Sequence, residues 1–180
     1  MAAEQDLHVD NTAHRLYFRG KAFPCDRDIE VALPWREYAL TLSSDTDCLS
    51  LWDTDGLVRL IRVGVYPQDM ALQQDTAYVC GGADGKLHLL NLPSLEELAE
   101  YSLPGMPERL CIAGDTVFVL TLLTEPEVHT GLLQLPQRSG RWVLLRRLRG
   151  IPEAITEDRS GLWITVSEGC THLCWDDIGT

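Results

Sequence analysis

The sequence lacks the short motifs that identify the common enzyme classes. It has no Gly-x-Ser-x-Gly elbow, no glycine-rich phosphate loop and no Cys-x-x-Cys pair, so the signatures of serine hydrolases, nucleotide-binding enzymes and thiol oxidoreductases are missing. No apolar run approaches the ~18 residues that a membrane-spanning helix needs. Residues 1–6 are polar and acidic, without a basic or an apolar segment, so we expect no signal peptide and a cytoplasmic protein.

Positive charge is also scarce. Lys and Arg total 15 against 27 Asp and Glu, and the formal net charge is −12. This imbalance argues against the phosphate backbone of a nucleic acid and against an anionic membrane surface as partners. The apolar content of 45% is ordinary for a globular protein, so we expect residues 1–180 to form a single domain.

The six cysteines do not require disulfides, because a chain of this length can bury a sufficient core without them. Cys48, Cys80 and Cys111 each lie inside an apolar run, where we expect reduced thiols that behave as small hydrophobes. Cys25 lies in a polar segment beside Arg27, whose charge would favour a reactive thiolate. An inert loop thiol is the simpler expectation for it.

The feature that predicts the fold is a weak repeat of about 40 residues. Three segments correspond: Tyr66-Pro67-Gln68-Asp69-Met70-Ala71, Met106-Pro107-Glu108-Arg109-Leu110-Cys111 and Ile151-Pro152-Glu153-Ala154-Ile155-Thr156. Their prolines are 40 and 45 residues apart, and an aromatic residue that begins an apolar run recurs at the same steps, as Tyr78, Phe118 and Trp163. Periods of this length with several short strands are typical of β-propeller blades.

The stretch between Pro67 and Pro107 illustrates the predicted blade. We expect strands over residues 69–73, 77–81, 86–92 and 98–103, with Asp84-Gly85 as a hairpin turn. The chain then divides into units 38–66, 67–106, 107–151 and 152–176. Residues 1–37 are atypical; they contain strand-like segments that would complete the unfinished last unit. The predicted fold is all-β, a propeller of about four four-stranded antiparallel blades of 40–45 residues.

Two third-strand segments resemble known propeller families. Cys48-Leu49-Ser50-Leu51-Trp52-Asp53 and His172-Leu173-Cys174-Trp175-Asp176 resemble the WD40 strand that ends in Trp-Asp, although the Gly-His dipeptide that precedes WD40 blades is missing. The joints Pro104-Gly105-Met106-Pro107-Glu108 and Gly150-Ile151-Pro152-Glu153 are similar to those of YncE-type and lactonase-like bacterial propellers. The resemblance implies a propeller that holds a protein or peptide through the loops of one face.

Four units are the lower limit for a closed ring. The chain therefore either closes tightly on itself, shares a ring with a second copy as a homodimer, or is part of a longer protein. We favour the homodimer, because a terminal unit can bury its apolar face only against another unit.

Candidate metal ligands fall in two places. Glu108 and Glu153 follow matched prolines, and Asp69 lies close to the equivalent place. The lactonase-like resemblance implies that such a ring of carboxylates would hold a cation such as Ca²⁺, whereas repetition alone accounts for the residues equally well. Cys170, His172 and Cys174 would share one face of a strand. Ligands ~7 Å apart along a strand reach one ion poorly, and a fourth ligand is not evident.

The leading hypothesis is a non-catalytic binding or scaffold propeller without a cofactor. The competing hypothesis is a lactonase-like hydrolase with a cation at the channel mouth, held by Asp69, Glu108 and Glu153. Under either hypothesis we expect the repeat aromatics Tyr78, Phe118 and Trp163 to pack between blades.

Overall fold

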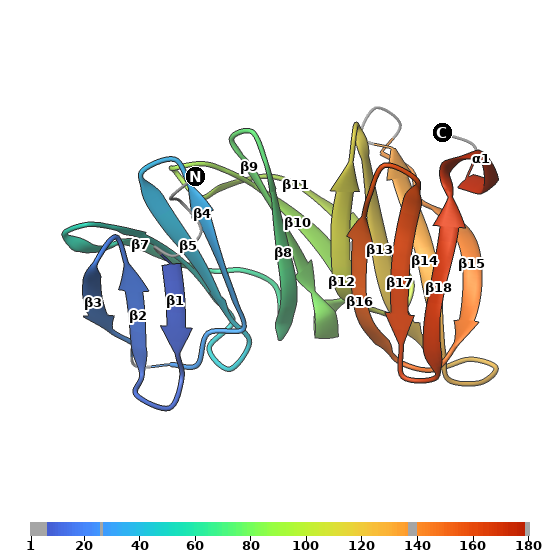
Figure 1. The fold of residues 1–180 in the computed structure, drawn as a ribbon, viewed down its shortest axis with the longest axis horizontal. Coiled ribbons are helices and arrows are strands. Elements are labelled where there is room, and N and C mark those ends of the chain that lie inside the picture. The colour runs from blue at the N-terminus through green and yellow to red at the C-terminus, as the bar shows by residue number, and fades with distance from the viewer. Residues whose placement is uncertain (1–6, 26, 137–139, 179–180) are drawn as a thin grey trace.

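A computed structural model describes residues 7–25, 27–136 and 140–178, and it consists of five antiparallel sheets that follow one another along the chain (Figure 1). Each sheet is a meander in which consecutive strands pair, because short turns connect them. The sheets stand in a row, with the first and the last at opposite ends (Figure 1). The expected all-β, propeller-like fold is confirmed.

The two terminal sheets have three strands each, and the three sheets between them have four. The first sheet contains β1 (Leu7–Asp10), β2 (Arg15–Phe18) and β3 (Lys21–Pro24). The fifth and last contains β16 (Pro152–Glu157), β17 (Gly161–Val166) and β18 (Gly169–Cys174). The second sheet contains β4 (Val31–Trp35), β5 (Tyr38–Ser43), β6 (Cys48–Asp53) and β7 (Gly56–Arg62). The third contains β8 (Pro67–Gln73), β9 (Thr76–Gly81), β10 (Lys86–Asn91) and β11 (Glu96–Ser102). The fourth contains β12 (Met106–Ala113), β13 (Thr116–Leu123), β14 (His129–Pro136) and β15 (Val143–Arg149).

Helical structure is limited to two short segments in the described part of the chain, η1 (Gly82–Asp84) and α1 (Trp175–Ile178). Neither is long and apolar enough to cross a membrane.

The N-terminal strands form a sheet of their own, so the expectation that they complete the last unit is wrong. The physical reason is their apolar content. Leu16 and Phe18 on β2 are buried together with Ala39 and Trp52 of the second sheet, which holds β1–β3 at that end of the row. The expected count of about four units therefore becomes five sheets.

The last predicted strand is displaced. We expected it over His172–Asp176, but β18 covers Gly169–Cys174 and Trp175 begins α1. Cys174 already pairs with Gly161, the first residue of β17, so the chain beyond it has no partner strand. The indole of Trp175 instead donates a hydrogen bond to the carbonyl of Asp158 (3.2 Å).

Separate apolar clusters fill the four interfaces between neighbouring sheets. Strand alternation assigns each side chain to one interface: Val117 and Val119 of β13 pack toward the third sheet, whereas Phe118 and Leu120 pack toward the fifth. The core is thus a series of layers, each made by two adjacent sheets.

The repeat aromatics show where this series ends. Tyr78 (5% exposed) and Phe118 (0%) pack against the next sheet, as expected, but Trp163 is 44% exposed. Trp163 occupies the same place on β17 that Phe118 occupies on β13, so its ring points to the side on which a sixth sheet would stand. The expectation that Trp163 packs between sheets is therefore wrong.

Candidate binding face

The first strands of the third, fourth and fifth sheets share one pattern of exposure. Pro67, Pro107 and Pro152 are buried, while the residue before each proline is a large apolar side chain that faces solvent. These three residues, which we call the apolar row, are Tyr66 (53% exposed), Met106 (39%) and Ile151 (48%).

A β-bulge follows each of the three prolines, between Pro67 and Asp69, Pro107 and Arg109, and Pro152 and Ala154. Proline has no N–H to donate in a strand ladder, so within sheets it is found at the first residue of a strand and at bulges. The bulge also places the residues after the proline differently from a regular strand. The apolar row is therefore a product of the repeat's backbone and recurs wherever the proline does.

The backbone at Tyr66 is strained. Its φ is 54°, in the left-handed region that a bulky residue rarely adopts. The carboxylate of Asp47 holds this conformation by accepting a hydrogen bond from the Tyr66 amide (2.8 Å). The other two joints have glycine before the apolar residue, Gly105 at φ 71° and Gly150 at φ 99°. Strained residues of this kind concentrate at sites that bind ligands.

The joints lie side by side along one rim of the molecule. The Asp69 carboxylate on β8 accepts a hydrogen bond from the Leu110 amide on β12 (2.9 Å), and Arg109 Nε on β12 donates to the Glu153 carbonyl on β16 (2.7 Å). Gly82, in the turn after β9, sits so close to the carbonyls of Tyr66 and Pro107 that a Cβ there would come within 2.9 and 3.6 Å of them. Adjacent members of the apolar row therefore belong to one continuous face.

Asp69 is a structural acceptor in this face. Its carboxylate also accepts a hydrogen bond from the Met70 amide (2.8 Å). Burial raises the pKa of Asp69, an effect that these two amides and the charge of Arg109 oppose. Burial likewise raises the pKa of Glu108, against the charge of Arg109. Glu153 is exposed.

The three predicted cation ligands do not occupy equivalent positions. Glu108 and Glu153 correspond to Gln68, whereas Asp69 corresponds to Arg109 and Ala154. The Arg109 guanidinium bridges the backbone carbonyls of Glu108 and Glu153, each at 2.7 Å. Among the described residues, the carboxylates of Asp69, Glu108 and Glu153 are not gathered as one set of three metal ligands. A cation site at these residues remains a prediction.

Some of the cysteines lie in the core, and others lie on the face of the fifth sheet that carries the exposed Trp163, which we call the open end. Cys25 is buried together with Phe18 and Trp52 rather than exposed in a loop, and Cys48 and Cys80 are buried as expected. Burial raises the pKa of Cys111 to about 12 and that of Cys80 well above its usual value.

Cys170 and Cys174 are exposed on the fifth sheet. Between them, the His172 ring lies 4.4 Å from the ring of Trp163, centroid to centroid, and its Nδ1 is 3.9 Å from Cys174 Sγ. The two thiols and the imidazole are not gathered as ligands of one ion within the described structure.

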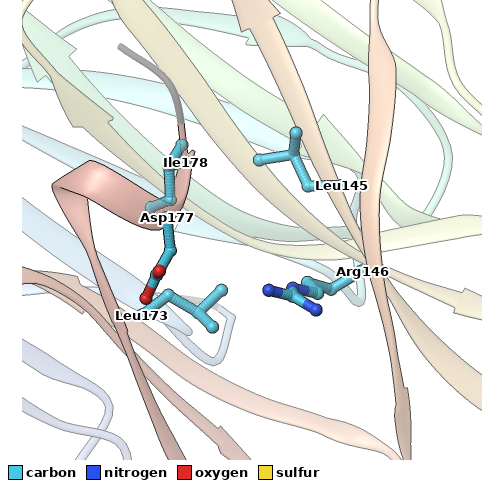
Figure 2. Close-up of a pocket in the computed structure, with 5 residues that line it drawn as sticks. All are labelled: Leu145, Arg146, Leu173, Asp177 and Ile178. Carbon is cyan, nitrogen blue, oxygen red and sulfur yellow. The ribbon is translucent and has the colours of Figure 1, made fainter.

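One of the pockets between the fourth and fifth sheets lies beside α1 and is small. Figure 2 shows its lining, which consists of Arg146, Asp177 and the aliphatic side chains Leu145, Leu173 and Ile178. Its volume is about 120 Å³, whereas sites for organic ligands usually enclose about 300–1,000 Å³. This pocket does not provide a second candidate for ligand binding.

Comparison with known proteins supports the fold alone. No family model matches the sequence, and no curated protein matches it. The solved structures that resemble it include the hydrazine synthase of Kuenenia stuttgartiensis, with a TM-score of 0.69 at 12% identity over 94% of this chain and 62% of that one. They also include the dihydro-heme d1 dehydrogenase NirN, solved in complex with DHE, with a TM-score of 0.70 at 15% identity over 95% of this chain and 41% of that one.

Both of these proteins are known β-propellers. A third similar structure is the computationally designed protein Ika4, with a TM-score of 0.66 at 11% identity over 83% of this chain and 92% of that one. The chain therefore spans only part of the length of the two natural proteins, and at these identities the likeness carries no function.

Proposed function

We propose that this protein is a non-catalytic binding propeller that holds a peptide or a protein segment across the apolar row. The observation that supports the proposal is the recurrence of an exposed, large apolar side chain at one position of three successive repeats: Tyr66, Met106 and Ile151. Isolated exposed apolar residues are normal, but a row of them on adjacent strands is typical of an interaction site.

The spacing and charge of the row suggest the chemistry of the partner. Packed sheets are about 10 Å apart, and three residues of a polyproline-II segment advance about 9 Å and bring every third side chain to the same face. The face also carries Glu108 and Glu153, and the protein has a net charge of −12. We therefore propose an extended segment with apolar residues at every third position and Lys or Arg between them.

A selection from a displayed library of random peptides tests the proposal. Selected peptides should share this pattern and bind the purified protein in isothermal titration calorimetry. The triple variant Tyr66→Ser, Met106→Ser, Ile151→Ser should weaken their binding by roughly 2 kcal/mol or more, since buried apolar and aromatic anchors dominate such interfaces.

The matched control is Leu57→Ser, Val58→Ser, Leu98→Ser, which removes apolar side chains of similar exposure from β7 and β11. It should leave peptide binding unchanged. Selection of no peptide, or equal affinity for both triple variants, would overturn the proposal.

A second copy of the chain is the partner we propose for the open end. Trp163 stands at the position where Tyr78 and Phe118 contact a following sheet, and it is 44% exposed. Covering this face with a sheet of another copy would bury the Trp163 ring in the same way. Light scattering at decreasing concentration tests this, because a particle of one chain's mass at every concentration rules out the shared assembly.

The alternative function is a lactonase-like hydrolase with a cation at Asp69, Glu108 and Glu153. Its electrostatics are unfavourable, because the Arg109 guanidinium already lies between the Glu108 and Glu153 carbonyls and near the Asp69 carboxylate. Calorimetric titration with CaCl₂ distinguishes the two functions. Stoichiometric binding that Glu153→Gln abolishes would favour the hydrolase over the binding propeller.

A further inference from the structure

A cluster of polar side chains lies away from the apolar row, on the neighbouring strands β10 and β11 of the third sheet. His88 on β10 pairs directly with Glu100 on β11, and Leu90 pairs with Glu97. In a regular strand, residues 97 and 100 would point to opposite faces. A bulge between Leu89 and Leu90 leaves Leu98 without a partner in the ladder and returns Glu97 to the face that carries His88 and Glu100.

The imidazole of His88 lies between two carboxylates. Its side chain is only 7% exposed, with Nε2 at 3.0 Å from Asp84 Oδ2 and Nδ1 at 2.8 Å from Glu97 Oε1. A neutral imidazole has one N–H, so it can donate to only one of the two. The second contact requires a further positive charge, supplied either by a second ring proton or by a metal ion that both Nδ1 and Glu97 bind.

Glu100 completes the group. One ligand atom each from His88, Glu97 and Glu100 lies within 4.8 Å of the other two, which among the described residues is the one such set of three or more. Lys86 Nζ also contacts both Glu100 oxygens (2.8 and 2.9 Å) and lowers the pKa of Glu100 through its hydrogen bond. This lysine is on a flexible stem and partly exposed, so it can release Glu100 to another cation.

The repeat does not account for the cluster. The pair that corresponds to His88 and Glu100 is Ser50 and Leu60 in the second sheet, and Leu133 and Leu144 in the fourth. Burial of an imidazole between carboxylates costs free energy that these neighbouring pairs do not incur. The third sheet therefore carries a feature that its fold does not need.

Two glycines and a cavity give the cluster room. A Cβ at Gly64 would lie 3.1 Å from His88 Nε2 and 3.2 Å from Asp84 Oδ2, and one at Gly81 would collide with the Asp84 carboxylate. On the other side, His88, Glu97 and Glu100 line an open cavity of about 370 Å³ at the outer edge of the second and third sheets, together with Arg62 and Leu95.

We propose that His88 Nδ1, Glu97 and Glu100 bind a divalent transition-metal ion such as Zn²⁺, with the fourth coordination position open to this cavity. Zn²⁺ takes imidazole nitrogen and carboxylate oxygen at about 2.0–2.2 Å, and three protein ligands with an open position form a recurrent zinc geometry. Asp84 supplies the carboxylate that typically hydrogen-bonds the other nitrogen of a metal-bound histidine and so fixes its tautomer. The site is independent of the apolar row and of the function proposed for it.

Calorimetric titration of the chelator-treated protein with ZnCl₂ tests the site. We expect one equivalent to bind. Glu97→Gln and Glu100→Gln should each weaken binding about 100-fold or more. Asp84→Asn, which removes the carboxylate beside His88 Nε2 but keeps an oxygen for the Lys86 amide, should weaken it about 10- to 100-fold. Glu97 and Glu100 are about half exposed, so these two variants should fold even if a His88 variant does not.

Two control variants locate the ion. Glu96→Gln changes a neighbouring exposed carboxylate on the same strand, and Cys170→Ser, Cys174→Ser removes the exposed thiols of the fifth sheet. Both should bind Zn²⁺ as the unmodified protein does, and the Co²⁺ form should show no thiolate charge-transfer band. The absence of Zn²⁺ binding, unchanged binding in Glu97→Gln and Glu100→Gln, or loss of binding in the double serine variant would each overturn the proposal.

Discussion

Phe118 and Trp163 occupy the same position of the repeat and have opposite environments. Phe118 is fully buried between the fourth and fifth sheets, whereas Trp163, on the fifth, is 44% exposed. The neighbouring strands β12 and β16 have matching bulges, and they pair with β13 and β17 in the same register. The burial of an aromatic residue in this protein is therefore decided by whether another sheet follows, and not by the strand that carries it.

The polar contacts between inner strands differ in the same way. Asp69 accepts the Leu110 amide of the next sheet, and Arg109, at the same position, donates to the Glu153 carbonyl of the next sheet. The third member of this series is Ala154, on the last sheet. In the third and fourth sheets this position carries a side chain that reaches the next sheet, and in the last sheet it carries alanine.

Replacement of the two aromatics gives the largest test of this comparison. Phe118→Ala should lower the free energy of unfolding by about 3–5 kcal/mol, because it opens a cavity in a closed layer. In dilute protein, where light scattering shows a single chain, Trp163→Ala should lower it by less than about 1 kcal/mol, as for other surface substitutions. Urea denaturation monitored by circular dichroism measures both. Similar losses for the two variants would show that Trp163 is covered, as it would be in an assembly with a second copy.

Thiol reactivity compares the same regions without mutation. Cys170 and Cys174, on the exposed face of the fifth sheet, should react quickly with a thiol reagent in dilute protein, where the chain is alone. Cys80 and Cys111 should react at least about 100-fold more slowly. Burial limits the access of the reagent, and it also raises the pKa of both thiols, to about 12 for Cys111, so that little thiolate is present. Mass spectrometry of the labelled protein over time gives the rates. In denaturant all six cysteines should be labelled at similar rates, and any that are not would reveal a disulfide.

Removal of the forward-reaching carboxylate should have a smaller effect. Asp69→Ala leaves the Met70 and Leu110 amides without their acceptor and should cost about 1–3 kcal/mol. Introduction of a carboxylate at the last position, Ala154→Asp, should change stability by less than about 0.5 kcal/mol, because no following strand offers an amide. Equal effects in thermal unfolding would contradict the assignment of Asp69 as a link between sheets.

The smallest effect should come from Asp158, which tethers the exposed Trp163. Hydrogen bonds from Ser160, first of all, and from the Trp163 indole lower the pKa of Asp158 below its usual value of 3.8. A carboxyl with a lower pKa in the folded state stabilises the fold above its unfolded pKa and loses that contribution as the pH falls. The melting temperature should therefore be higher for the unmodified protein than for Asp158→Ala near pH 7, and the difference should shrink below about pH 4. A difference that persists at pH 2 would exclude this origin.

Much of the fold could be predicted from local signals. The spacing of Pro67, Pro107 and Pro152 located the first strands of the third, fourth and fifth sheets, and the predicted strand Cys48–Asp53 has the same bounds as β6. Such signals arise within one repeat, so they carry no information about which sheets lie next to it. The separate N-terminal sheet and the exposure of Trp163 depend on which sheets stand side by side, and neither could be inferred from a single strand.

The two candidate sites differ in the same respect. The apolar row could have been found, because a large apolar residue precedes each matched proline in the sequence. The group of His88, Glu97 and Glu100 could not, since it depends on a bulge at Leu98 that shifts Glu97 to the other face of β11. A one-residue irregularity in strand pairing leaves no reliable trace in a single sequence.

The short joints between sheets have a consequence for how such a chain can change in evolution. Only residues 63–66, 103–105 and 150–151 connect the last four sheets, and every apolar layer is made by two sequence neighbours. A tandem duplication of residues 67–105 would therefore insert a complete sheet, and only the layer between the two copies would be new. The number of sheets is free to grow or shrink one genetic unit at a time, while the interior of each remaining sheet stays as it was.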